Sequence, residues 1–535
     1  MKLGMYTVLL GLIIGCGCGD GAGAGDDDVP LDAPAVDAPK SAEQLGCEDM
    51  VVGEPADNRE RIQTCLDAPW GYAFLRAEVY PIDGGLVIDA GDVLAGPAPD
   101  RRATIQPAVA SAPFAVVSNA ILNVVNTTAG PAGGTLRNVT LDLRDARPVP
   151  GARLFGIRIA FDDNLVEDVE ITSTPMPWRE VAATSLYFGT GFRNKAQRLH
   201  LHGAAYGIAF VNGITAEMSP WVDRAKLEDN RGDAVTFAGY GKITNSIVRR
   251  NGFDDGDSGT GTRLPPGGAL YASHVNVHGG WIEGNQITDA CGADLELNMT
   301  RGFVVRDNVF ANPGWPGMNG MRSVIRPGEL AYDVPAGFCR ATMTALLIAL
   351  AGSEFRGNTF LNDNRPANTS VATSNGGTEE WFGPGKADLP LPEGTSIAVA
   401  FVLGRTHRAS NGMVHYAVNN AFIGNHMSST SGAAGLGWIA GRDTGFGPGG
   451  SWDTTTANVF DDNSHCAPNS GPCTAAPHSV RCGDNRYATG TATCVGPDGS
   501  NLFDGVATGN SCNRDDITHE GAGHDARRND GCLHY

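Results

Sequence analysis

Charged and aromatic residues are scarce in this chain, and the spacing typical of helices is missing. Only 18% of the 535 residues are charged and 7% are aromatic, whereas glycine alone accounts for 72. No long stretch places apolar residues at the 3.6-residue spacing of an amphipathic helix. These absences exclude a helical bundle and favour short strands joined by many turns.

Several short motifs of well-known chemistry are also absent. The sequence has no CxxC pair, which argues against a cysteine-ligated zinc site, and it has no phosphate-binding glycine loop and no nucleophile elbow. A formal net charge of −20 and the lack of a basic patch lead us to expect no nucleic-acid partner. The same charge would repel an anionic polymer unless a bound cation or local arginines compensate for it.

The first residues read as a targeting segment. An apolar run over residues 3–14 follows a single lysine, is too short to span a bilayer and ends in Gly15-Cys16. Residues 1–15 resemble the lipobox signal of bacterial lipoproteins, and this resemblance implies cleavage before Cys16 and lipidation of its thiol. We therefore expect an exported protein, held on the outer membrane or the cell surface by a lipid anchor. The alternative is an ordinary signal peptide cleaved a few residues downstream.

Residues 16–45 are predicted to be a flexible acidic tether, because they are rich in Gly, Ala, Pro and Asp and contain no aromatic residue. Cysteine usage agrees with export, since disulfides persist in oxidising compartments. With Cys16 as the lipid site and Cys18 left over beside it, the other 10 of the 12 cysteines can form bridges. Local spacing suggests the pairs Cys47–Cys65, Cys291–Cys339, Cys466–Cys473, Cys482–Cys494 and Cys512–Cys532, although spacing alone does not fix this connectivity.

A short theme recurs from about residue 136 onward, within a repeat domain that we place at residues 46–463. Alternating apolar residues lead into a turn Asn or Asp, and further apolar residues follow, as in VEDVEIT (166–172), QRLHLHG (197–203) and IEGNQIT (282–288). Successive copies mostly lie twenty-odd residues apart, and a period of this size indicates a solenoid of strands. One coil cannot bury its inward side chains alone, whereas stacked coils bury them in a continuous column. We expect the turn Asn residues to tolerate left-handed backbone geometry and to hydrogen-bond along the stack as a ladder.

A second set of strands, with phrases such as GADLELN (292–298), alternates with this theme. Together the two sets resemble the pectin-lyase-like right-handed β-helix superfamily. Within that resemblance, ADNRERIQTCLD (56–67) corresponds to an N-terminal capping helix and residues 73–96 to the opening coils. The implied fold is all-β, a right-handed parallel β-helix. We expect residues 464–535, which lose the repeat and hold six cysteines, to form a disulfide-rich C-terminal cap.

The resemblance also implies a groove beside the second strand set. The long loops 172–184, 251–268, 311–343 and 361–395 should all emerge on one side and wall it. Enzymes of this fold use such a groove for polysaccharide, but the fold also hosts adhesins and tailspikes, so it does not decide the activity.

Alternation within these strands points to candidate catalytic residues. In ADLELN, Asp294 and Glu296 should point outward, about 7 Å apart by strand rise. That separation fits the roughly 6.5–9.5 Å needed by the two carboxylates of an inverting glycosidase. In GALYASH, Tyr271 should point outward and His274 lies at the strand end.

A lyase is the second chemical interpretation. It needs a cation to neutralise a uronate carboxylate and a base to remove the neighbouring proton. Asp255 and Asp257, in an Asp-rich loop upstream, are the candidate Ca²⁺ ligands, with Asp294 and Glu296 as further oxygen donors. Arg301, Arg263, His274 or Tyr271 are candidates for the base.

The sequence thus predicts a cell-envelope protein that acts on or binds polysaccharide, as a lyase or a glycoside hydrolase. The alternative is a non-catalytic adhesin or glycan-binding module, for which a rigid β-helix on a tether is equally suitable.

Overall fold

The computed structural model describes part of the chain. The described residues are 46–108, 120–125, 133–144, 153–173, 182–252, 269–273, 278–298, 300–311, 322–323, 332–333, 343–348, 350–362, 397–402, 404–405, 415–416, 420–429, 436–439, 459–461, 464–466, 479–482, 511–512 and 516–519. The predicted signal, the tether, Cys16, Asp255, Asp257 and His274 lie outside them.

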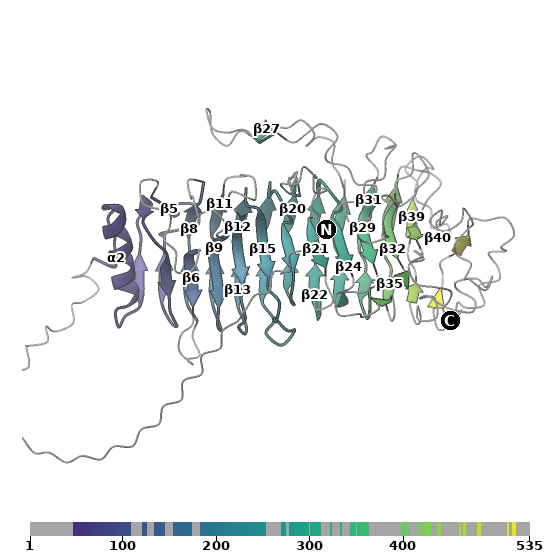
Figure 1. Ribbon diagram of the computed structural model, residues 1–535, viewed down its shortest axis with the longest axis horizontal. Helices are drawn as coiled ribbons and strands as arrows, with labels where there is room; N and C mark the ends of the chain where they lie inside the picture. Colours follow the sequence, from purple (N-terminus) through teal and green to yellow (C-terminus); the bar gives the residue numbers. More distant parts are fainter. Residues whose placement is uncertain are drawn as a thin grey trace, which may run out of the picture. The chain divides into compact units, whose positions relative to one another are not determined.

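The chain winds through three parallel sheets, which we number 1 to 3, and most turns of the winding add one strand to each sheet in that order. The strands stack along one axis (Figure 1). Sheet 1 contains β1 (Tyr72–Phe74), β4 (Val93–Ala95), β7 (Thr135–Arg137), β10 (Leu165–Glu167), β13 (Lys195–Gln197), β16 (Trp221–Asp223), β19 (Lys242–Thr244), β22 (His278–Glu283), β25 (Arg301–Arg306), β30 (Glu354–Arg356), β35 (Ala421–Ile423), β38 (Val459–Asp461) and β41 (Ser511–Cys512).

Sheet 2 contains β2 (Val79–Ile82), β5 (Ala103–Pro107), β8 (Val139–Asp142), β11 (Glu170–Thr172), β14 (His200–His202), β17 (Lys226–Glu228), β20 (Ile247–Arg249), β23 (Gln286–Thr288), β26 (Val309–Ala311), β31 (Thr359–Asn362), β36 (His426–Ser429) and β39 (Ser464–Cys466). Sheet 3 contains β3 (Leu86–Ile88), β6 (Ala120–Val125), β9 (Arg153–Ala160), β12 (Ala182–Phe188), β15 (Tyr206–Phe210), β18 (Val235–Phe237), β21 (Leu270–Ser273), β24 (Leu295–Asn298), β29 (Met343–Ile348), β32 (Ile397–Val402), β37 (Leu436–Ile439), β40 (Ser479–Cys482) and β42 (Asp516–His519). This order of parallel strands is that of a right-handed parallel β-helix, the fold that the resemblance implied.

Two short antiparallel pairs lie outside the three sheets. They are β27 (Arg322–Ser323) with β28 (Tyr332–Asp333), and β33 (Gly404–Arg405) with β34 (His415–Tyr416). The long loops of the sequence all connect a strand of sheet 2 to the next strand of sheet 3, for instance β20 to β21 and β31 to β32. They therefore begin and end at the same junction of each coil, between sheets 2 and 3, as predicted.

The core is a column of inward side chains held in register from coil to coil. In sheet 2, Leu141, Ile171, Leu201 and Leu227 are successive partners and none is exposed to solvent. Aromatic rings stack in the same way, with 5.0 Å between the ring centroids of Phe188 and Phe210. Each coil thus covers the apolar side chains that its neighbour could not bury alone.

The turn between sheets 1 and 2 explains the recurring Asn. Its first residue has a left-handed backbone, with φ near 54° at Asn138 and 66° at Gly284, so Gly, Asn and Asp are favoured there. In many coils the ladder Asn is the second residue, not the left-handed one. Asn285, Asn308 and Asn358 are buried second residues, and each Nδ2 donates to the Oδ1 of the next ladder Asn at 2.9–3.0 Å. The predicted ladder is confirmed, while left-handed geometry falls mainly on the residue before it.

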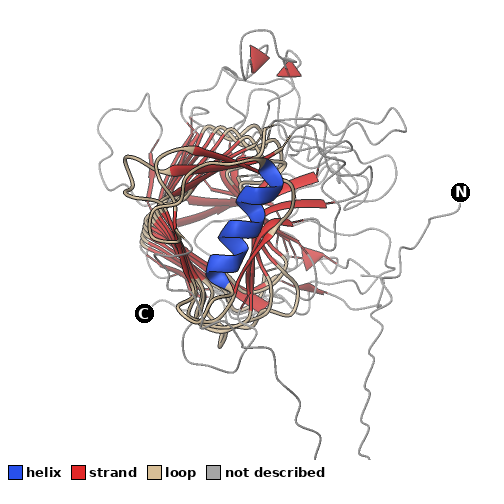
Figure 2. Ribbon diagram, turned by 90° about the vertical axis from the view of Figure 1, so that its left-hand side faces the viewer, coloured by secondary structure: helices blue, strands red, loops and turns tan. Residues whose placement is uncertain are grey.

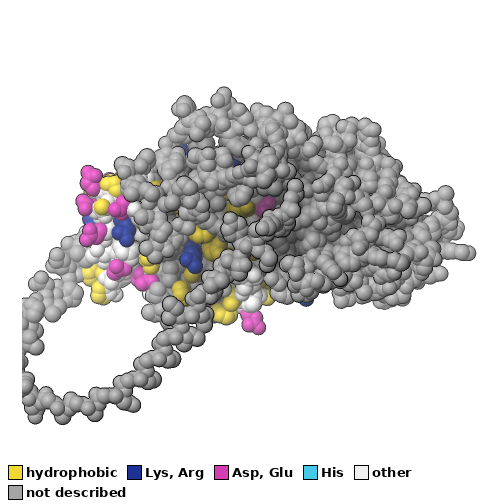
Figure 3. Space-filling view, in the orientation of Figure 1, with side chains coloured by type: hydrophobic (Ala, Val, Ile, Leu, Met, Phe, Trp, Pro, Cys, Tyr) yellow, Lys and Arg dark blue, Asp and Glu magenta, His cyan; other side chains and the backbone are white. Residues whose placement is uncertain are grey.

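Helix α2 (Pro55–Leu66) closes the N-terminal end of the coils (Figure 2). It buries Asn58, Ile62, Cys65 and Leu66, and the disulfide between Cys47 and Cys65 fixes it to the preceding segment. Acidic and basic side chains are interspersed at this end of the molecule, the left-hand end in Figure 3. The predicted capping helix and this disulfide are therefore confirmed.

Two further predictions concern the C-terminal half of the chain, the Cys291–Cys339 disulfide and the disulfide-rich cap. Cys291 is disulfide-bonded, and its predicted partner Cys339 lies outside the described residues. Strands β39 to β42 fall within residues 464–535 and extend the three sheets, and a disulfide-rich cap stays a prediction there. Within the described part of the chain, no helix is long and apolar enough to cross a membrane.

Candidate functional site

Two of the predicted site residues, Tyr271 and Glu296, fall on one row of sheet 3. Strand pairing aligns Arg158 with Tyr187, Thr236 with Tyr271, and Tyr271 with Glu296, with Ala209 between Tyr187 and Thr236. We call these six residues the sheet 3 row. Adjacent coils are about 4.8 Å apart, so Tyr187 and Tyr271 stand about 14 Å from each other.

Exposure changes along the sheet 3 row. Arg158 is exposed, and Tyr187, Thr236 and Tyr271 are partly exposed, whereas Glu296 is only 1% exposed. The ring of Tyr187 packs against Phe155, with 4.5 Å between ring centroids, which limits its rotation. The row is thus an open track with two phenol rings and a buried carboxyl group at one end.

Asp294 occupies a different environment from Glu296. It is fully buried and precedes β24, and its Oδ1 accepts a hydrogen bond from the Ala290 backbone N–H at 3.4 Å. This contact spans the turn that leads into the strand. Asp294 therefore has a local role in shaping the turn, which the alternation of ADLELN did not reveal.

Arg301 lies on another sheet. It begins β25 of sheet 1, is exposed, and pairs in register with His278, so it does not belong to the sheet 3 row. His274, Asp255 and Asp257 lie outside the described residues, and a Ca²⁺ site there remains a prediction. Among the four candidate catalytic residues that the structure describes, register joins only Tyr271 and Glu296 directly.

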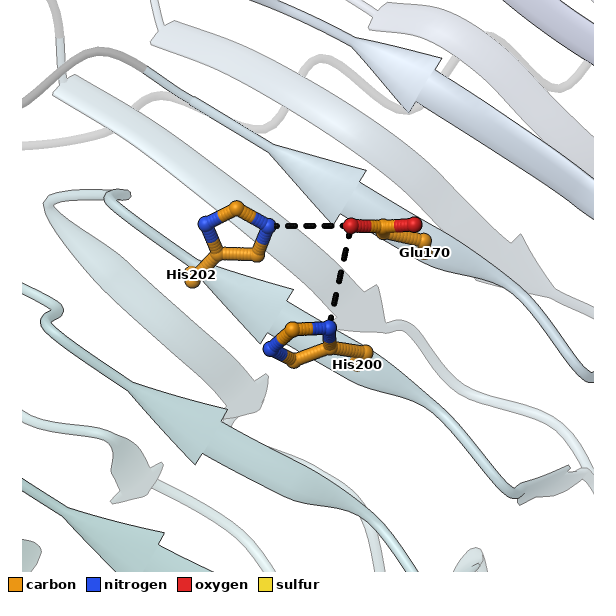
Figure 4. A group of neighbouring side chains, drawn as sticks. All are labelled: Glu170, His200 and His202. Carbon is orange, nitrogen blue, oxygen red and sulfur yellow. Dashed lines mark hydrogen bonds and ion pairs between the residues drawn. The ribbon is translucent and has the colours of Figure 1, made fainter. Parts of the chain in front are cut away.

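A second candidate group of polar side chains lies on the outward face of sheet 2. Glu170, His200 and His202 come from the neighbouring strands β11 and β14, and their side chains point toward one another (Figure 4). His202 Nε2 is 3.3 Å and His200 Nδ1 is 3.7 Å from the same atom, Glu170 Oε1. The two imidazole rings stack with 4.6 Å between centroids. Among the described residues this is the one group of three His, Cys, Asp or Glu side chains with potential metal-ligand atoms so close together.

Neighbouring charges orient this group, which we call the Glu170 cluster. Glu228 Oε2 lies 3.2 Å from His200 Nε2, on the side of the ring opposite Glu170. Arg102 Nη1 donates to the other carboxylate oxygen, Glu170 Oε2, at 3.2 Å. The Thr172 hydroxyl oxygen lies 2.9 Å from His202 Nε2. The cluster is therefore held by residues of the three successive strands β11, β14 and β17 and by Arg102, which precedes β5.

The protonation of these groups follows from the same contacts. The hydrogen bond with His202 is the main cause that lowers the pKa of Glu170, and the nearby His200 and Arg102 add to it. Burial and the neighbouring His202 lower the pKa of His200. Burial by itself would raise the pKa of Glu228, but hydrogen bonds from Lys226 and Arg249 outweigh it and lower the value to about 2. At neutral pH the cluster combines ionised carboxylates with a neutral His200.

The sequence held a signal for this cluster that the repeat analysis did not use. In QRLHLHG the two histidines flank Leu201 and so share the outward face of a strand. Glu170 precedes His200 by one coil of 30 residues, and only the strand register places them side by side. A single-strand pattern cannot supply that second piece of information.

Comparisons with known proteins give matches among solved structures alone. No family model matches it, and no curated protein matches its sequence. Among solved structures, the mannuronan C-5 epimerase AlgE4 A-module of Azotobacter vinelandii is similar with a TM-score of 0.46 and 13% identity, over 76% of this chain and 91% of the module.

Two further solved structures are similar to this chain. The DFA-IIIase of Arthrobacter chlorophenolicus A6 gives a TM-score of 0.44 at 13% identity, over 77% of this chain and 92% of the enzyme. A tailspike protein 2 from an Escherichia coli O157:H7 bacteriophage gives 0.38 at 9% identity, over 81% of this chain and 48% of the tailspike. The assignment of the fold itself rests on the order and parallel register of the three sheets.

Proposed function

We propose that this protein binds a linear polysaccharide along the sheet 3 row and cleaves it at the end of the row that carries Glu296. The observation behind the proposal is the register that aligns an exposed Arg158, two partly exposed tyrosines and a carboxyl group along successive coils. Aromatic faces stack on sugar rings, and a row that runs along the helix axis suits an extended polymer. The guanidinium of Arg158 adds a site for an acidic substituent.

Cleavage is the finer part of the proposal. Both glycoside hydrolysis and β-elimination need a positioned group that transfers a proton. Glu296 is the carboxyl group of the row, and its register partner Tyr271 brings a phenol to the neighbouring coil. Asp294 accepts a backbone hydrogen bond within the turn. We therefore assign the acid–base role to Glu296 alone and not to a pair of carboxylates.

A binding module without catalysis is the second candidate. It is favoured by the low exposure of Glu296, 1%, next to the open part of the row. In that case the polymer would contact Tyr187 and Tyr271 and would be released without cleavage.

A panel of neutral and uronate-containing polysaccharides, each with and without Ca²⁺, tests the proposal. New reducing ends together with an unsaturated product that absorbs in the ultraviolet would establish a lyase, and reducing ends alone would establish a hydrolase. Binding without new reducing ends would indicate the non-catalytic binding module. A panel in which no polymer is bound or cut would contradict the proposal, and a requirement for Ca²⁺ would support the candidate site at Asp255 and Asp257.

We further propose that the chain is exported and anchored by a lipid on Cys16. Support comes from the lipobox-like end of the apolar run and from the aromatic-free tether that follows. In a bacterial host that processes lipoproteins, the full chain should incorporate labelled fatty acid and sediment with membranes. Cys16→Ala should incorporate no label and be released from the membrane fraction, whereas equal label in both would refute the anchor.

A further inference from the structure

We propose that Glu170, His200 and His202 form a binding site for a divalent transition-metal ion, with Zn²⁺ as the first candidate. The site lies on sheet 2 and is independent of the polysaccharide function proposed for sheet 3. Two imidazole nitrogens and one carboxylate oxygen are a donor set that Zn²⁺ accepts, and three protein ligands leave one position for water or another ligand.

The distances fit a tetrahedral ion. With bonds of about 2.1 Å, ligand atoms of a tetrahedral site are about 3.4 Å apart. Glu170 Oε1 is 3.3 Å from His202 Nε2 and 3.7 Å from His200 Nδ1, so two edges of the tetrahedron are already formed. All three ligand atoms lie within 4.8 Å of one another, so an ion that binds them would draw the two imidazole nitrogens together by at most about 1.4 Å.

The surroundings orient the ligands as outer-shell groups of metal sites do. Glu228 faces His200 Nε2 at 3.2 Å, so the ring N–H donates to this carboxylate and the lone pair of Nδ1 points to the centre. Arg102 occupies Glu170 Oε2, which leaves Oε1 for the ion. A carboxylate that fixes a ligating histidine and a cation that fixes a ligating carboxylate are both positioned before any ion arrives.

Access and charge are compatible with an exchangeable ion. The side chains of Glu170, His200 and His202 are 26%, 31% and 29% exposed, so an ion can enter from solvent. Lys226 and Arg249 are engaged with Glu228, and their positive charges are largely balanced there. Arg102 remains close to the ligands, and we therefore expect reversible binding that a chelator removes.

Zinc titration of the purified protein tests the site, with an affinity tag that contains no histidine. After treatment with a chelator, the protein should bind Zn²⁺ in calorimetry. His202→Gln and Glu170→Gln should each weaken this binding by about tenfold or more, and Glu228→Gln by about 10–100-fold, the usual cost of an outer-shell change. Co²⁺ in place of Zn²⁺ should give the visible absorption of a tetrahedral site, and Ca²⁺ should not compete because it prefers oxygen ligands.

His426→Gln is the matched control. His426 lies in the same outward row of sheet 2 as His200, several coils away, and should leave the tight Zn²⁺ binding unchanged. A zinc-edge anomalous map of the wild-type crystal keeps the test independent of how the variants fold. A peak between Glu170 Oε1, His200 Nδ1 and His202 Nε2 is expected. Its absence at saturating Zn²⁺, or equal losses in His202→Gln and His426→Gln, would overturn the site.

Discussion

The outward faces of sheets 2 and 3 are built on the same coils but differ in how their side chains are used. On sheet 3 an open row of Arg158, Tyr187 and Tyr271 leads to the buried Glu296. On sheet 2 the Glu170 cluster is a compact network in which each charged group faces a partner one or two coils away. The two proposals therefore assign an extended polymer track and a small ion site to separate faces of one solenoid.

The strongest test of the sheet 3 face is Glu296→Gln. If the protein cleaves polysaccharide, loss of the acid–base carboxyl group should lower turnover by about 10²–10⁴-fold. Glu354→Gln, on sheet 1, is the control and should keep turnover near the wild-type value. Full activity of Glu296→Gln would remove this residue from the mechanism.

Asn308→Ala probes the scaffold that both faces share. Asn308 Nδ2 donates to Asn358 Oδ1 at 2.9 Å and to the Ile282 carbonyl at 2.8 Å, and the change leaves buried partners unsatisfied. We expect the free energy of unfolding to fall by about 2–3 kcal/mol. Thermal melts would show this as a lower Tm. Gln286→Ala, an exposed position in the same region, should change Tm little, and equal shifts would contradict a special role for the ladder.

Glu228→Gln tests the electrostatics of the sheet 2 face through pH. The pKa of Glu228 is lowered from 4.5 to about 2, so its contribution to stability is present above pH 4.5 and is lost as the pH falls toward 2. At neutral pH the variant should be less stable by about 1–2 kcal/mol, a figure reduced for solvent screening of the partly exposed Lys226 and Arg249. The difference in Tm between variant and wild type should shrink between pH 4.5 and pH 2. A difference independent of pH would show that the ion pairs do not stabilise the fold.

Tyr271→Ala should have the smallest effect and should be confined to the sheet 3 face. Loss of one stacking ring is worth about 0.5–1.5 kcal/mol, or roughly 2–10-fold in affinity for the polysaccharide. Tyr206→Ala is the matched control, because Tyr206 is 37% exposed on β15 of the same sheet but lies outside the row. Similar losses in both variants would indicate that the polymer is not guided by the row.

The sequence was informative wherever one strand or one turn decides the outcome. Alternation in GALYASH and ADLELN placed Tyr271 and Glu296 outward, and pairing of β21 with β24 then made them neighbours. The resemblance of residues 56–67 to a capping helix implied α2, and the short spacing of Cys47 and Cys65 suggested their disulfide.

Other features depend on contacts that no single segment contains. The Glu170 cluster needs the register between β11 and β14, which a variable coil length hides. Asp294 looked like an outward strand residue, but the turn from Ala290 recruits its carboxylate before the strand begins. Arg301 is close to Glu296 in sequence and yet starts a strand of another sheet, because the chain passes to the next sheet after each strand of a coil.

Binding of the polysaccharide identified in the panel, measured for His202→Gln beside Tyr271→Ala, tests the separation of the two faces most directly. The account predicts that His202→Gln binds the polymer with wild-type affinity while Tyr271→Ala binds it roughly 2–10-fold more weakly. Weakened binding in His202→Gln, with Tyr271→Ala unchanged, would contradict the account and move the polysaccharide site to sheet 2.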